Sequence, residues 1–305
     1  MHRPPSLVKT ATAVLLSAVL VGACVTKAHG ATVLHHGHNQ VAPMGTSVPI
    51  PEFPPSTVGS GFDGLESRVK QATSNAADAG ADMSIVILDR HTGQMVSNGN
   101  GTSFPIASVA KLYIADDLLL QVAKGQIQLS PADRNAFDVM LRSSDDGAAE
   151  DFWNRSGGDD IISRVSSRYG LTGTSAPYNG RWFNTLSTAD DLVRYYDKLL
   201  TGSGGLPAEQ ADVIINDLSQ STPTGIDGYP QRFGIPDGLS DETVAVKQGW
   251  MCCWDGGNWM HMSTGVIGAD HRYVMVIGSL QPTDDSTARN TLTQAVKTMF
   301  PGGRI

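Results

Sequence analysis

The chain has 305 residues, of which 40% are hydrophobic and 17% charged, and its formal net charge is −8 at pH 7. These proportions are typical of an ordinary globular protein, in one large domain or two small ones, and they exclude wholesale disorder. The acidic balance and the lack of a basic patch interleaved with aromatic residues exclude nucleic acid as an expected partner.

The first 23 residues have the organisation of an export signal. Arg3 and Lys9 precede an apolar run from residue 11 to residue 23, which is too short for a stable membrane span. The run ends in Leu-Val-Gly-Ala directly before Cys24. This resembles a bacterial lipobox, and the resemblance implies cleavage before Cys24, lipidation of its thiol and attachment to the extracytoplasmic face of the cell membrane. The alternative is a secretory signal that happens to contain a cysteine.

Residues 24–60 are predicted to be a flexible tether, because prolines recur between residues 43 and 55 among small and uncharged residues. His35, His36 and His38 lie in this segment. Ordering a flexible tether around a metal ion would cost much entropy, so we expect no metal site there. No cofactor is expected either.

The folded domain is expected from residue 61 to residue 305, and it begins with a helix and a hairpin. Leu65, Val69 and Ala72 have the spacing of an amphipathic helix that ends at Gly80. A short apolar run at residues 83–88 and a second at residues 94–98, separated by a turn, predict two antiparallel strands.

A long helical region follows. Pro105 ends any earlier helix, and apolar residues at helical spacing between residues 112 and 119 predict a helix that begins at Ser108. Ser130 followed by Pro131 is a typical helix start. Helical patterns continue to about residue 200, and Pro207 opens one more helix.

The last third of the chain changes to strands, predicted at residues 242–248, 262–268 and 273–280, before a closing helix at about residues 286–300. Two early strands and three late ones make one five-stranded antiparallel sheet with the terminal helices against a face. The helices between them form an all-helical second lobe. The expected fold class is therefore α+β, or mixed α/β.

Cys252 and Cys253 are the two cysteines that remain beside Cys24. Neighbouring cysteines can close only a strained ring, so we expect two buried thiols on opposite faces of a strand. A redox protein that uses this pair is a remote alternative.

Ser108 and Lys111 are the first candidate catalytic pair. Residues three apart on a helix share a face, so the Ser108 hydroxyl and the Lys111 amine are expected side by side. A serine becomes a nucleophile when a neighbouring base takes its proton, and a lysine serves as that base when burial lowers its pKa. The alternative is a helix-capping serine beside an unrelated lysine.

Two further motifs favour the catalytic interpretation of Ser108 and Lys111 over the helix-capping one. Ser144-Asp145-Asp146 follows a predicted helix, and Lys247-Gln248-Gly249 ends a predicted strand. With Ser108-x-x-Lys111, they resemble the S-x-x-K, S-D-N and K-T-G signatures of penicilloyl-serine enzymes. The resemblance covers about residues 62–305. The loop at residues 231–236 and the closing hairpin are similar to class A β-lactamases, and the overall run resembles mycobacterial alanine-rich lipoproteins.

The resemblance implies a role for each matched residue. Ser108 would be the nucleophile, Lys111 its base and Ser144 the relay of protons to the leaving amine. Substrate binding would fall to Asp146, Lys247, Gln248, Gly249 and Trp250, with Lys247 attracting a substrate carboxylate. The backbone N–H groups of Ser108 and Trp250 would form the oxyanion hole.

Three departures from the family pattern bear on activity. The asparagine of S-D-N is Asp146, whose carboxylate cannot donate a hydrogen bond and should raise the pKa of Lys111. The hydroxyl of K-T-G is replaced by the amide of Gln248. No glutamate lies between Glu150 and Glu209, and the segment at residues 171–184 is short for the loop that carries the deacylating glutamate of class A enzymes. Fast β-lactam hydrolysis is therefore not expected.

The expected function is a slow serine hydrolase or acyl transferase that is exported and lipid-anchored. Its ligand would be a β-lactam or a peptidoglycan-type acyl-D-amino acid, and we expect a monomer. The alternative is a pseudoenzyme that binds cell-wall peptide or a protein partner without turnover. Trp250, Trp254 and Trp259 either line a substrate groove or pack under a loop, and His261 and His271 are expected to be structural.

Overall fold

The structure is a computed structural model that describes residues 62–305. The predicted export signal, Cys24 and the tether lie outside the described residues. Among the described residues, no helix combines the length and the apolar character needed to cross a membrane.

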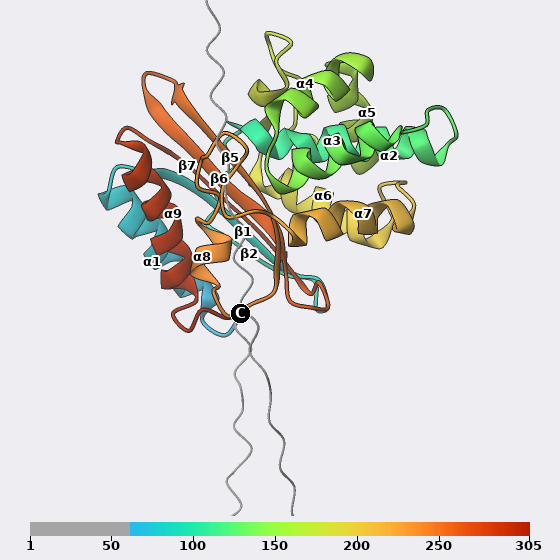
Figure 1. The fold of residues 1–305 in the computed structure, drawn as a ribbon. Helices are drawn as coiled ribbons and strands as arrows, with labels where there is room; N and C mark the ends of the chain where they lie inside the picture. Colours follow the sequence, from blue (N-terminus) through green and yellow to red (C-terminus); the bar gives the residue numbers. More distant parts are fainter. Residues whose placement is uncertain (1–61) are drawn as a thin grey trace, which may run out of the picture. The chain divides into compact units, whose positions relative to one another are not determined.

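A five-stranded antiparallel sheet forms the centre of the described domain, as predicted (Figure 1). The strand order is β2-β1-β7-β6-β5, which joins the two early strands to the three late ones. Ile85 lies opposite Ile277 where the early and late strands meet. The strands are β1 (Asp82–Asp89), β2 (Gln94–Ser97), β5 (Val244–Trp254), β6 (Asn258–Ile267) and β7 (Tyr273–Gln281).

Both terminal helices pack on one face of this sheet (Figure 1). They are α1 (Leu65–Asp78) and α9 (Asp285–Met299), and the short helix α8 (Ile235–Gly238) lies beside α9. Leu65 and Val69 of α1 are buried together with Ile85 and Ile87 of β1. Alternate residues of β1 face this layer, because side chains in a strand point to opposite faces in turn.

The opposite face of the sheet is covered by the predicted helical lobe (Figure 1). Its helices are α2 (Lys111–Ala123), α3 (Pro131–Arg142), α4 (Asp146–Arg155), α5 (Asp160–Tyr169), α6 (Ala189–Thr201) and α7 (Ala208–Ser219). Short strands β3 (Phe104–Pro105) and β4 (Leu186–Ser187) pair at its edge. Ser130 caps α3 in a capping box with Asp133, and Pro131 takes the first helical position, as the sequence predicted.

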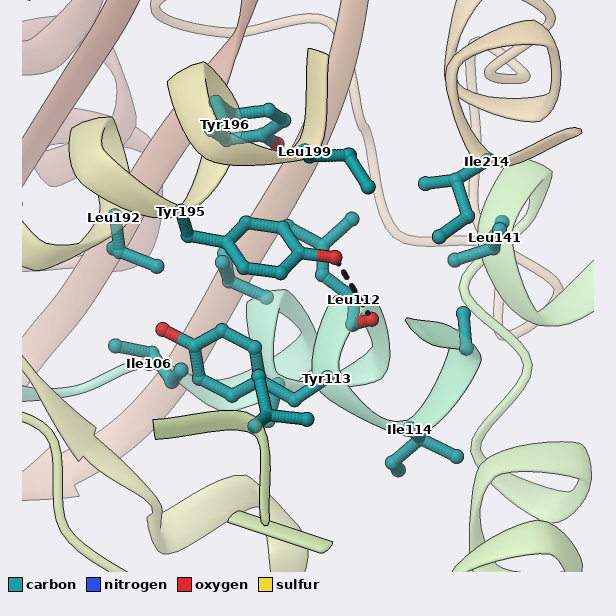
Figure 2. Close-up of a cluster of buried hydrophobic side chains, with 14 of the residues drawn as sticks. Ile106, Leu112, Tyr113, Ile114, Leu141, Leu192, Tyr195, Tyr196, Leu199 and Ile214 are labelled. Atoms are coloured by element: carbon teal, nitrogen blue, oxygen red, sulfur yellow. Dashed lines mark hydrogen bonds between the residues drawn. The ribbon is translucent and has the colours of Figure 1, made fainter. Parts of the chain in front are cut away.

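Helix α2 is the central helix of this lobe, and Figure 2 shows the apolar side chains packed around it. Every residue from 107 to 120 is buried, so α2 has no solvent-facing side in this stretch. The Tyr195 hydroxyl donates a 3.2 Å hydrogen bond to the main-chain oxygen of Leu112, which is drawn as the dashed line in Figure 2. Such complete burial fixes the first turn of α2, where Lys111 lies.

Strand β5 is longer than predicted and forms a hairpin with β6 that extends past the rest of the sheet. The pairing is irregular between Met251 and Trp254, so side chains there no longer alternate cleanly between faces. Cys252 and Cys253 lie in this irregular stretch, where both are exposed and joined by a disulfide. The prediction of two buried thiols was therefore wrong, because it assumed a regular strand within the sheet.

Candidate active site

Ser108 lies in a single 3₁₀ turn, Ala107–Ala110, that leads into α2. The preceding segment is held by the β3–β4 pair and by a 2.9 Å hydrogen bond from the Ile106 N–H to the oxygen of Thr185. Ala107 has a φ of 43°, in the left-handed region that residues with a side chain rarely adopt. Strain of this kind is commonly found at active sites, where the surrounding structure holds it in place.

Lys111 is fully buried and reaches the side chains of both candidate serines. Its Nζ lies 2.8 Å from Ser108 Oγ and 3.0 Å from Ser144 Oγ. It also lies 2.7 Å from the Ser144 main-chain oxygen and 2.6 Å from Asp146 Oδ1. A protonated Lys111 can donate three hydrogen bonds to these four oxygens. A neutral Lys111 has a lone pair that can accept the proton of the Ser108 hydroxyl. The arrangement therefore suits both protonation states of Lys111.

Ser144 connects the two lysines of the site. It directly precedes Asp145, the residue that caps α4 by accepting from Ala148 N–H, and its own φ is 57°. Lys247 Nζ lies 2.9 Å from Ser144 Oγ, and Lys247 is 1% exposed. A continuous chain of contacts thus runs from Ser108 through Lys111 and Ser144 to Lys247.

Gly249 lets strand β5 approach the turn that carries Ser108. A Cβ atom at Gly249 would lie 2.5 Å from the main-chain oxygen of Ile106 and 3.2 Å from Val109 Cγ2. Only glycine permits this contact without displacing the backbone. Gly249 was expected in the site from the K-T-G resemblance, and the structure shows that this position is in close backbone contact with the turn that carries Ser108.

Burial lowers the pKa of Lys111 below its ordinary value, and the carboxylates of Asp146, Asp145 and Asp227 oppose that shift. The expected upward influence of Asp146 is therefore present, but burial outweighs it. Burial also places the pKa of Lys247 well below its ordinary value, with a further lowering from the nearby charge of Lys111. Both lysines are consequently easier to deprotonate than lysines in water.

A pocket of about 240 Å³ opens in front of Ser108. Asp146 lines it together with Trp182, Phe183 and Trp250, and Ala107, Met251 and Cys252 complete the wall. Ser108 and Trp250, the expected sources of the oxyanion-hole donors, thus line the same pocket. Lys247 does not line it, and its amine contacts Ser144 Oγ.

Trp182 was missed by the sequence analysis. Its ring centroid lies 4.8 Å from Lys111 Nζ, and its Nε1 donates a 3.1 Å hydrogen bond to Glu150 Oε2. The segment that lacks the expected glutamate therefore supplies an aromatic ring beside the lysine. A lone tryptophan in an irregular loop gives no periodic signal, so the sequence offered no way to find this contact.

Gln248 does not reach the pocket, contrary to expectation. Its side chain is buried, and Nε2 donates to the main-chain oxygens of Gln231 at 3.0 Å and Phe233 at 2.6 Å. Side chains alternate along a strand, so Lys247 and Gln248 point to opposite faces of β5. Since Lys247 faces Ser144 in the helical lobe, Gln248 must face the other way.

Trp250 belongs to an aromatic group that extends away from the pocket. Its ring stacks on Tyr229, with centroids 4.3 Å apart, and the Tyr229 hydroxyl lies 2.7 Å from His261 Nε2. His261 is fully buried, which lowers its pKa to about 4, and it lies 3.1 Å from Asp285 Oδ1. His261 is thus a neutral part of the packing behind Trp250.

A larger cleft of about 720 Å³ lies elsewhere in the helical lobe. Its arginines are engaged in ion pairs: Arg164 with Asp117 at 2.7 Å, and Arg168 with Asp116. No nucleophile next to a base lines this cleft, so the smaller pocket at Ser108 is the candidate active site. Within residues 62–305, no three residues of the metal-ligating types form a cluster that could hold an ion.

The described residues have the fold of class A β-lactamases, and the site has a serine and a lysine side by side within that fold. A model of the Beta-lactamase enzyme family matches residues 64–132. A β-lactamase from Chitinophaga pinensis superposes with a TM-score of 0.64 at 15% identity, over 78% of this chain and all 100% of that chain. The structure of PBP-A does so with a TM-score of 0.64 at 18% identity, over 79% and 96%. At such identities the two structures show the shared fold.

The closer relationship is to mycobacterial proteins named "Putative lipoprotein LppW". Those of Mycobacterium tuberculosis and Mycobacterium bovis are 64% identical to the chain over 255 residues, which are 84% of this chain and 81% of theirs. The chain belongs to the LppW family.

Proposed function

We propose that the chain is an exported, lipid-anchored serine enzyme that is acylated slowly at Ser108. Its acyl donor would be a β-lactam or a peptidoglycan-type acyl-D-amino acid. The observation that carries the proposal is the 2.8 Å contact between Lys111 Nζ and the Oγ of Ser108, which lines the pocket. The burial that lowers the pKa of Lys111 supports it, because a catalytic base must be neutral when it accepts a proton.

The proposed acylation step moves two protons. Neutral Lys111 takes the hydroxyl proton of Ser108 while Oγ attacks the carbonyl carbon, and the backbone N–H groups of Ser108 and Trp250 stabilise the oxyanion. Ser144, held between Lys111 and Lys247, passes a proton to the leaving nitrogen as the carbon–nitrogen bond breaks. With an acyl-D-amino acid the products are an acyl ester on Ser108 and a free amine, whereas with a β-lactam the ring opens and the amine stays attached to the acyl ester.

Deacylation should be slow. The chain between Glu150 and Glu209 offers no glutamate to activate a water molecule, and Trp182 occupies the space beside Lys111. The acyl ester is therefore expected to persist.

Mass spectrometry after incubation with a reactive β-lactam tests this proposal. The protein should gain the mass of one β-lactam on Ser108 and keep it for far longer than a β-lactamase turnover, whereas Ser108→Ala should gain none. Rapid release of hydrolysed drug would show that another group replaces the missing glutamate. If no adduct forms even at very high β-lactam concentrations, the alternative of a pseudoenzyme that binds its ligand without turnover replaces the proposal of an enzyme.

The membrane anchor is the second part of the proposal. It is supported by the Leu-Val-Gly-Ala sequence before Cys24 and by the relationship to proteins named as lipoproteins. Expressed in a mycobacterial host, the protein should partition into detergent as a lipid-modified monomer. Cys24→Ala should partition into the aqueous phase, and unchanged partitioning of this variant would end the lipid-anchor proposal.

A further inference from the structure

The pocket at Ser108 has an unusual charge for a site that would bind carboxylates. Asp146 is its only charged lining residue, and the Asp146 side chain is 75% exposed. One of its oxygens, Oδ1, lies 2.6 Å from Lys111, while Oδ2 has no hydrogen-bond partner among the described residues. A carboxylate oxygen that faces a pocket accepts hydrogen bonds and attracts positive charge.

The charges around the pocket reinforce this preference. Asp145 and Asp227 lie near enough to act on Lys111 together with Asp146. The two lysines that oppose them, Lys111 and Lys247, are buried and engaged with serine oxygens. An anionic group that enters the pocket therefore meets an exposed carboxylate before it meets a cation.

Aromatic rings form the rest of the wall. Trp182, Phe183 and Trp250 line the pocket, and each presents an electron-rich ring system. Two of these rings already attract cations from the protein: Lys111 Nζ lies 4.8 Å from the Trp182 centroid, and Arg181 lies 6.0 Å from that of Phe183. Trp250 has Tyr229 on one face and contacts no cation of the described residues closely enough to count as an ion–ring pair.

We propose that this pocket binds an ammonium group, held by the free oxygen of Asp146 and by the aromatic wall. This inference rests on the proposed function and names its substrate class. The substrate would be an acyl donor with a positively charged amine on the acyl side of the reacting carbonyl. A carboxylate combined with aromatic rings is the arrangement that recognises ammonium groups in proteins. The proposed mechanism places the leaving nitrogen at Ser144 and the substrate carboxylate at Lys247, which does not line this pocket. An amine bound in the pocket would therefore belong to the acyl side of the substrate.

Ammonium binding would also favour the chemistry. A cation on the free oxygen of Asp146 offsets the negative charge that stabilises protonated Lys111. The neutral amine then becomes more populated, and Ser108 is deprotonated more readily. A cationic acyl donor would therefore help to activate the base that attacks it.

Binding can be measured without any reaction. The detergent-solubilised full chain carrying Ser108→Ala is titrated with benzylamine and with benzyl alcohol, which differ in the ammonium group, and tryptophan fluorescence reports binding. We expect benzylamine to bind about fivefold to tenfold more tightly. Asp146→Asn in the same background should reduce this ratio to about one. Asp151→Asn, on the same helix but outside the pocket, should leave the ratio unchanged.

Equal affinity for the two compounds, or a preference that survives in the Asp146→Asn variant, would overturn the inference. Acylation of the unmodified Ser108 protein is measured separately. Ampicillin, which carries an ammonium on its acyl side chain, should acylate it faster than benzylpenicillin, which lacks that group. If neither penicillin forms an adduct, the proposed function fails, while the ammonium site still stands or falls on the benzylamine titration.

Discussion

Replacing Asp146 by asparagine should speed the acylation of Ser108 by an acyl donor without an ammonium group, because it removes the charge that stabilises protonated Lys111. Asp146 Oδ1 lies 2.6 Å from Lys111 Nζ, and the Asp146 side chain is 75% exposed. At this distance, with the dielectric constant of water as the exposure suggests, Coulomb's law gives about 1.6 kcal/mol. The population of neutral Lys111 at a fixed pH should then rise about tenfold.

The assay follows the labelling of Ser108 by benzylpenicillin over a range of pH. The acylation rate should rise with pH as Lys111 loses its proton, since only the neutral amine accepts the Ser108 proton. Removing the Asp146 charge lowers the pKa of Lys111 further, in the direction in which burial already shifts it. The midpoint of the pH–rate curve should therefore move to lower pH in Asp146→Asn.

Asp151→Asn is the matched control, because it removes a carboxylate from the same helix at a site that pairs with Arg155 instead. It should leave both the rate and the midpoint unchanged. If Asp146→Asn labels no faster than the original protein and has the same midpoint, Asp146 does not control the proton on Lys111. The assignment of Lys111 as the base would then be refuted as well.

Two further predictions concern packing and acid stability. Gly249→Ala should cost about 1–3 kcal/mol of stability and slow acylation, because the added Cβ would lie 2.5 Å from the Ile106 oxygen. Gly101→Ala is the control, because a Cβ there would have nothing within 4 Å. Equal melting temperatures of the two variants would contradict the argument. Asp89→Asn should cost about 2 kcal/mol at pH 7, since Arg272 donates to that carboxylate at 2.6 and 3.0 Å. Arg272 lowers the pKa of Asp89 from 3.8 to about 2, so this stabilisation is complete above the unfolded-state pKa and is lost as the pH falls through the folded-state pKa. Urea unfolding should show the deficit of Asp89→Asn shrinking towards about pH 2, and a deficit independent of pH would count against the ion pair.

The sequence could predict the contacts that follow from local geometry. Ser108 and Lys111 are three residues apart, and a helical turn brings their side chains together whatever the rest of the chain does. The single five-stranded sheet could be predicted too, because two strands near the start of the domain and three near its end are separated by helices alone. The approach of Ser144 and Lys247 required the family resemblance, because no local rule relates residues 103 apart.

The errors have physical reasons that spacing does not reveal. Both influences on the pKa of Lys111 were expected, burial and the Asp146 carboxylate, but which one is larger depends on the packing of α2 on every side. Gln248 was assigned to the pocket although strand alternation turns it away once Lys247 faces Ser144. The exposure of Cys252 and Cys253 depends on how far the β5–β6 hairpin extends past its neighbours.

The backbone contact at Gly249 also bears on how proteins of this architecture diverge. The position of the nucleophile relative to strand β5 is set by two main-chain segments that touch without a side chain between them. The pocket walls, in contrast, are side chains: Asp146, Trp182, Phe183 and Trp250. Mutation can therefore exchange what the pocket accepts while the nucleophile keeps its place. Such a scaffold can acquire a new ligand one substitution at a time, because selectivity and reactive geometry are carried by different parts of the chain.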